Sequence, residues 1–203
     1  TKYHMHLLQK LYLIFGIKNT LQEMPAKIET KDWKIEASPM IHGIATYAYS
    51  FIIKEKIKID KAKLKKLKIP NSPLIGHLQQ GKDITINGKK IKAKNVTYTQ
   101  PGKKITIIMD TKMNENAIRL ANNADLIICE STYASAEADY AEEYKHLTST
   151  QSATIAKKAK AKQLILTHIA QRYENKTDTI LKEAKKVFKN TKIVKDLDVI
   201  TIK

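Results

Sequence analysis

Polar side chains that can bind a metal or move a proton stand at the ends of three apolar runs. The runs KITIIM, DLIIC and QLILT are followed directly by Asp110, Glu130 and His168. If the runs are buried strands of an α/β sheet, their carboxyl ends meet at one edge, where such folds bind ligands. Two histidines join the list of candidates: His42, just ahead of another predicted strand, and His146, at the end of a predicted helix.

An aspartate and several histidines at one sheet edge suit a metal such as zinc. Each of these side chains taken alone has a simpler interpretation as the polar cap of a strand or helix. Three apolar runs that end in this way favour a site, and the residues by themselves predict a metal-dependent hydrolase. The sequence offers no glycine-rich phosphate loop and no serine–histidine pair in a nucleophile-elbow context.

The second half of the chain alternates strands and helices. We expect strands at 104–109, 125–129, 163–167, 193–194 and 199–202. Helices are expected at 114–123 and 136–144, from a cap at Ser149 through Ala161, and at 177–188, each with apolar residues at helical spacing. This alternation predicts a layered α/β domain.

The first half is less regular and contains a lysine-rich segment. Tyr47–Ile53 reads as a strand, and the segment Lys54–Lys68 that follows carries eight lysines against Glu55 and Asp60. We expect this segment to have too few apolar residues to bury itself, so that it projects with high mobility. Beyond it, Asn87-Gly88 predicts a type I′ hairpin turn.

Composition sets broader limits. The chain has 203 residues, a net charge of +17 and 42% hydrophobic residues. A positive charge of this size attracts nucleic acid, although a lysine-rich genome would give the same composition. No apolar run is long enough to span a membrane, and no signal peptide is expected. The single cysteine, Cys129, is compatible with a reducing, cytoplasmic setting.

Several motifs in matching order resemble the ribonuclease Z family of the metallo-β-lactamase superfamily. Met109-Asp110-Thr111 is similar to its GDT motif, Cys129–Tyr133 to its HEATF box and His146–Ser149 to its HST motif. Leu166–Tyr173 is similar to its LTHISxRY motif and Asn71–Gly81 to its PGPLFGKLKKG segment. His42 precedes Tyr47-Ala48-Tyr49 as a family histidine precedes a YGY-like strand, and Leu13–Thr20 resembles an IYGPxGT strand.

The superfamily motif HxHxDH is not intact. Residues 1–6 (TKYHMH) resemble a damaged remnant without its aspartate, and His4 and His6 are candidate metal ligands within it. We expect residues to be missing here, by truncation, by mutation or because the sequence joins separate segments. Cys129 and Met109 replace residues that, in the family, are not thought to bind metal.

The resemblance implies an αββα metallo-β-lactamase-type fold over residues 1–203, incomplete at its N-terminus, with a flexible arm inserted at 54–80. It implies two zinc ions per subunit that activate a water, with His42, Asp110 and His168 among the ligands. Glu130 would orient His146, and His146 would protonate the leaving oxygen. The implied reaction removes the 3′ trailer from precursor tRNA and leaves a 3′-hydroxyl on the tRNA.

The resemblance also implies a homodimer in which the arm of one subunit grips the tRNA for its partner. The lysines expected to contact RNA are Lys54, Lys56, Lys58, Lys61, Lys63, Lys65, Lys66 and Lys68. Two alternatives stay open: another phosphodiesterase or hydrolase of the same fold, and a non-catalytic RNA-binding subunit that lacks HxHxDH.

Overall fold

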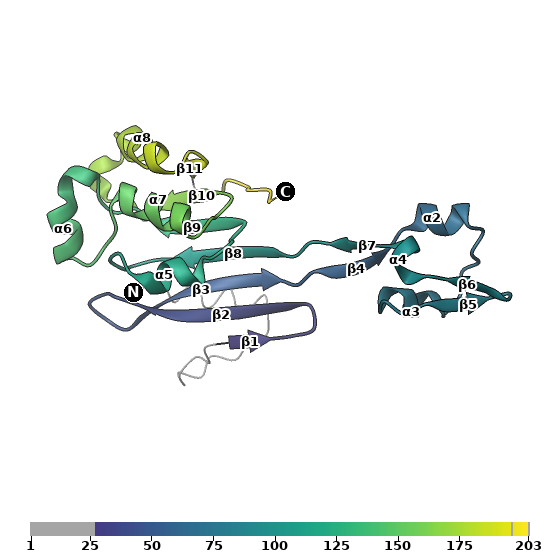
Figure 1. Cartoon of the computed structure of the whole chain (residues 1–203). Coiled ribbons are helices and arrows are strands. Elements are labelled where there is room, and N and C mark those ends of the chain that lie inside the picture. The colour runs from purple at the N-terminus through teal and green to yellow at the C-terminus, as the bar shows by residue number, and fades with distance from the viewer. Residues whose placement is uncertain (1–26, 196, 203) are drawn as a thin grey trace.

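A seven-stranded sheet forms the centre of the protein (Figure 1). The structure is a computed structural model that describes residues 27–195 and 197–202. The sheet has the order β1-β2-β3-β8-β9-β10-β11. These strands are β1 (Lys27–Glu29), β2 (Trp33–Met40), β3 (Thr46–Ile53), β8 (Lys103–Ile108), β9 (Leu126–Glu130), β10 (Leu164–Thr167) and β11 (Thr191–Ile193).

The three apolar runs singled out in the sequence are neighbouring parallel strands. Strand β9 lies between β8 and β10 and is parallel to both. Ile108 is opposite Cys129 and Thr167 is opposite Glu130, so the strands end level with one another. The predicted meeting of their carboxyl ends at one edge is therefore confirmed.

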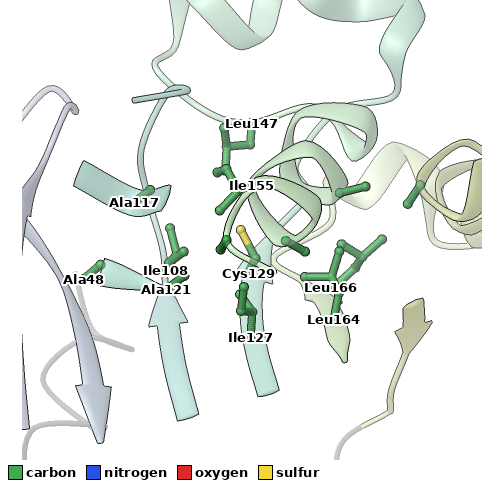
Figure 2. Close-up of a cluster of buried hydrophobic side chains, with 14 of the residues drawn as sticks. Ala48, Ile108, Ala117, Ala121, Ile127, Cys129, Leu147, Ile155, Leu164 and Leu166 are labelled. Carbon is green, nitrogen blue, oxygen red and sulfur yellow. The ribbon is translucent and has the colours of Figure 1, made fainter. Parts of the chain in front are cut away.

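Helices α5 (Glu115–Leu120), α7 (Ser149–Lys158) and α8 (Thr177–Val187) pack beside one another and enclose the main core with the sheet. Figure 2 shows this core, in which Ile155 of α7 lies near Cys129 and Ile127 of β9. A further helix, α6 (Ala138–Glu143), lies toward one end of the sheet. None of the described helices is long and apolar enough to cross a membrane.

Both predicted boundaries of α7 are wrong. Thr148, not Ser149, caps α7 through a capping box with Gln151, because the Ser149 hydroxyl is instead bonded to the Glu183 carboxylate. The helix ends at Lys158 rather than at Ala161. The expected closing strand 199–202 is absent from the described chain: Val199 is 92% exposed, and the edge of β10 is already occupied by β11.

Residues 56–100 form a second, smaller unit, which we call the projecting unit. Figure 1 shows it beyond the ends of β3 and β8. It contains β4 (Lys56–Ile59) paired with β7 (Thr97–Gln100), and β5 (Ile84–Ile86) paired with β6 (Lys89–Ile91). Its helices are α2 (Lys61–Lys66), α3 (Ile75–Gln79) and α4 (Ala93–Val96). The chain returns to the sheet through β7, which lies outside the predicted arm 54–80.

The expectation that Lys54–Lys68 cannot bury itself is wrong. The segment forms β4 and α2, and Leu64 is buried in a small core with Leu78, Ile84, Ile91 and Val96. The partners of Leu64 come from later in the chain, so the segment's own composition did not reveal them.

The predicted type I′ hairpin is confirmed, since Asn87 and Gly88 have φ of 49° and 72° between β5 and β6.

Gly102 stands where the two chain segments that lead to and from the projecting unit pass each other. A Cβ at this position would lie 2.4 Å from the Ile53 carbonyl oxygen and 3.1 Å from the Glu55 nitrogen. Both are backbone atoms, which cannot move aside as a flexible side chain can. Only glycine fits this crossing without displacing a strand.

We therefore expect Gly102→Ala to lower the free energy of unfolding by roughly 1–3 kcal/mol, as overpacking does in other proteins. Urea unfolding measures the change. Gly76→Ala in α3 is the matched control, since a Cβ there meets nothing within 4 Å and should leave stability unchanged or slightly raised. Equal effects of the two substitutions would show that the crossing is not tight.

Candidate metal centre

Three potential metal ligands converge at the edge of the sheet. One ligand atom each from Asp110, His146 and His168 lies within 4.8 Å of the other two. The His168 Nε2 atom is 3.1 Å from the Asp110 Oδ1 atom. Asp110 follows the end of β8, and His168 follows the end of β10, as the sequence predicts. The third residue, His146, comes from the segment between α6 and α7.

Unusual backbone conformations place these side chains. Asp110 has φ of 47°, His168 has φ of 53°, and Lys145, directly before His146, has φ of 56°. A positive φ is uncommon in residues other than glycine and costs free energy. These positive φ values occur where β8, α6 and β10 have just ended, so the chain changes direction directly beside the three candidate ligands.

Glu130 holds His146 from behind. Its side chain is fully buried at the end of β9. Its Oε2 atom accepts from His146 Nδ1 at 3.0 Å, from the Leu147 amide at 3.1 Å and from the Thr132 hydroxyl at 2.7 Å. Its Oε1 atom accepts from the Thr111 amide at 2.5 Å. With Nδ1 of His146 held in this way, Nε2 is the ring nitrogen whose lone pair is available.

The donor set fits a divalent metal of the zinc type. One carboxylate and two imidazoles are ligands that zinc accepts, and a histidine held by a carboxylate through its other nitrogen is the usual second-layer arrangement. The hydrogen bond from His168 to Asp110 raises the pKa of the His168 imidazole, with a further contribution from the carboxylate charge. The same charge that attracts a proton here would attract a cation.

The other predicted ligands lie differently. His42, in the loop after β2, donates from Nδ1 to the Lys145 carbonyl at 3.1 Å, and its ring centroid is 5.0 Å from that of His146. It therefore borders the group of three without belonging to it. His4 and His6 lie outside the described residues.

The Leu166–Tyr173 motif contacts the segment that directly follows the Cys129–Tyr133 motif. Arg172 pairs with Glu137 at 2.6 Å, and the Tyr173 hydroxyl accepts from the Ala134 amide.

Cys129 points into the main core, and burial raises the pKa of its thiol, so it is a packing residue. Its place explains why a cysteine is tolerated beside Glu130, whose side chain lies on the opposite face of β9.

Thr111 and Thr132, the partners of Glu130, are not among the residues that the sequence pattern predicts for the site. Thr111 directly follows the candidate residue Asp110, and Thr132 lies two positions after the candidate residue Glu130. A buried carboxylate requires several donors, and this requirement is the signal that points to neighbouring threonines and backbone amides.

Comparison with known proteins identifies relatives over most of the chain. Ribonuclease Z of Enterococcus faecalis is 41% identical over 177 residues, which cover 85% of this chain and 56% of the relative. Ribonuclease Z of Pediococcus pentosaceus is 38% identical over 182 residues, covering 86% and 58%. The chain spans less than two thirds of the length of these relatives. No family model matches it.

Solved structures show the same fold. The metallo-β-lactamase fold protein YhfI of Bacillus subtilis matches with a TM-score of 0.57 at 20% identity, covering 94% of this chain and 58% of YhfI. The short form of human tRNase Z matches with a TM-score of 0.52 at 18% identity, covering 98% and 65%. The predicted metallo-β-lactamase-type α/β fold is therefore confirmed.

We expect Glu130→Gln to lower the free energy of unfolding by roughly 1–3 kcal/mol, because the amide would leave a buried donor facing the donors that the carboxylate now satisfies. Urea unfolding measures the change. Glu143→Gln on the exposed side of α6 is the control and should leave stability unchanged. Equal stability of the two variants would contradict the role of Glu130 as the buried acceptor that holds His146.

Proposed function

The chain is a relative of ribonuclease Z with a metallo-β-lactamase fold, and from this premise we propose that the protein removes the 3′ trailer from precursor tRNA. The observation that carries the proposal is the group Asp110, His146 and His168, with Glu130 buried behind it. The expected product is a tRNA that ends in a 3′-hydroxyl, with a 5′-phosphate on the trailer.

In this proposal Asp110 and His168 hold zinc, with His42 close by as a further ligand. Zinc bound there would supply Lewis-acid activation of the attacking water and stabilise charge on the phosphate. The proposal extends to two zinc ions per subunit and to a homodimer, both supported by the family resemblance. Metal analysis and light scattering of the purified protein test these two points.

His146 is proposed as the general acid. Glu130 holds its Nδ1 atom, so that the ring keeps one orientation and Nε2 faces the group of ligands. The ring is partly shielded from solvent, with 16% of the side chain exposed. A histidine in this environment can deliver a proton to the oxygen that leaves as the phosphodiester bond breaks.

We expect His146→Ala to reduce cleavage of a precursor tRNA by roughly 10²- to 10⁴-fold while zinc content stays the same. Asp110→Ala should lose both activity and zinc. Gel assays of a 3′-extended precursor, with metal analysis of each variant, give the two readouts. Loss of zinc in His146→Ala would reassign this residue as a ligand. A wild-type protein that cleaves small phosphodiesters but not precursor tRNA would favour the alternative of another phosphodiesterase. A wild-type protein without any activity would favour the alternative of a non-catalytic RNA-binding subunit.

The projecting unit is proposed to bind the tRNA backbone. Seven of the eight lysines named above belong to it, on β4, on α2 or just after α2, and Lys54 lies two residues before β4. Lys54, Lys56 and Lys63 pair with Glu29, Asp32 and Asp60. Among the described acidic side chains, none pairs with the remaining five, Lys58, Lys61, Lys65, Lys66 and Lys68. Lysines of this kind contact phosphates without reading sequence.

We expect replacement of Lys58, Lys61, Lys65 and Lys66 by glutamine to weaken precursor-tRNA binding and to flatten its salt dependence. Each lost phosphate contact lowers the slope of log K against log salt by about 0.7–0.9. Filter binding at several salt concentrations measures the slope. The control removes four exposed lysines elsewhere, Lys157, Lys158, Lys189 and Lys192. An equal effect of both sets would show that overall charge, not the projecting unit, determines binding.

A further inference from the structure

A row of aromatic rings leads from the candidate metal centre onto the surface of α6. The Tyr133 ring centroid is 6.3 Å from that of His146 and 6.4 Å from that of Tyr140. The Tyr140 ring is in turn 6.3 Å from that of Tyr144. The planes of successive tyrosines differ by only 23° and 25°, so each ring is stacked against the next. We call these residues the tyrosine row.

Arg172 holds the inner part of the row in place. Its guanidinium carbon is 5.8 Å from the centroid of Tyr133 and 5.9 Å from that of Tyr140, within cation–π range of both rings. Its Nη1 atom is fixed by Glu137 at 2.6 Å. Tyr133 and Tyr140 are therefore held in place without a ligand, and a preorganised ring loses little freedom when it binds.

The outer two rings are not explained by packing in the core. Tyr140 is 48% exposed and Tyr144 is 54% exposed, whereas the side chain that α6 buries is Ala141. Two large rings one helical turn apart, half in solvent and beside a candidate catalytic histidine, form a surface available to a flat ligand. Tyr133, at 8% exposure, joins this surface to the site.

The charges around the tyrosine row favour contact with bases over contact with phosphates. Asp139, Glu142 and Glu143 belong to α6, so the helix would repel a phosphate backbone laid along it. Glu142 is paired with Lys112, and Glu137 with Arg172. An acidic helix that presents parallel aromatic rings can take the flat faces of nucleobases while the phosphates lie away from it.

We propose that Tyr140 and Tyr144 form a stacking subsite for the bases of single-stranded RNA at the cleavage site. The proposal rests on the proposed function, because an unpaired 3′ extension is the substrate part that passes the metal centre. Stacking of this kind tolerates any base, as an enzyme that accepts many trailers requires. Tyr133 would link the first stacked base to His146.

The test measures binding rather than cleavage. A short single-stranded oligoribonucleotide with one 2-aminopurine is titrated with the protein, because stacking on an aromatic ring quenches 2-aminopurine fluorescence. We expect Tyr140→Leu/Tyr144→Leu to remove the quenching and to weaken binding roughly 5- to 100-fold, the range for loss of one stacked base. Tyr140→Phe/Tyr144→Phe keeps both rings and should bind like wild type. The salt slope should be the same in all three proteins, since no phosphate contact is lost.

The outcomes separate this inference from the proposed function. Wild-type affinity in the leucine variant, a wild-type protein that does not quench the probe, or equal losses in both variants would overturn the stacking subsite even if precursor tRNA is cleaved. Loss of binding in the leucine variant alone would support it even if the protein cleaves no tRNA. Thermal unfolding of each variant verifies the fold, which should persist because both side chains are half exposed.

Discussion

The candidate site depends on a buried carboxylate and the donors that surround it. Glu130 is 0% exposed, and an unpaired carboxylate in such a place would be strongly unfavourable. Four donors remove most of this cost: the amides of Thr111 and Leu147, the Thr132 hydroxyl and His146. These donors follow three different elements, β8, β9 and α6. The requirement to satisfy one side chain therefore fixes the relative positions of three turns.

The candidate site and the projecting unit are built on two separate hydrophobic cores. The main core contains residues of the sheet and of α5, α7 and α8, and the second core is confined to residues 56–100 and their immediate surroundings. Only two chain segments connect them, at the crossing where Gly102 touches the backbone of Ile53. The metal centre can thus keep its geometry while the projecting unit carries its lysines at a distance. In the proposed function, catalysis and binding of the tRNA backbone would be tasks of different cores.

The sequence predicted the parts of this fold that local pattern determines. Apolar runs followed by Asp110, Glu130 and His168 identified three parallel strands and one edge. The cap of α7 was misplaced by one residue because Thr148 and Ser149 are equally good caps, and only the distant Glu183 decides between them. The folding of Lys54–Lys68 was missed because its core partners come from as far away as Val96. The positive φ of Asp110, Lys145 and His168 could not be predicted from residue type, because Asp and His adopt this region more often than most residues but still do so only rarely.

Two carboxylates at this sheet edge have different roles, and their surroundings decide which role each one has. Both oxygens of Glu130 accept hydrogen bonds from the protein and the side chain is fully buried, so this carboxylate holds His146 from behind. Asp110 is 22% exposed and lies beside His168, where a cation can reach it. The two carboxylates also differ in their place on the strands: Glu130 is the last residue of β9, whereas Asp110 lies beyond the end of β8. In the proposed function, this difference makes Asp110 a metal ligand and Glu130 the residue that positions His146.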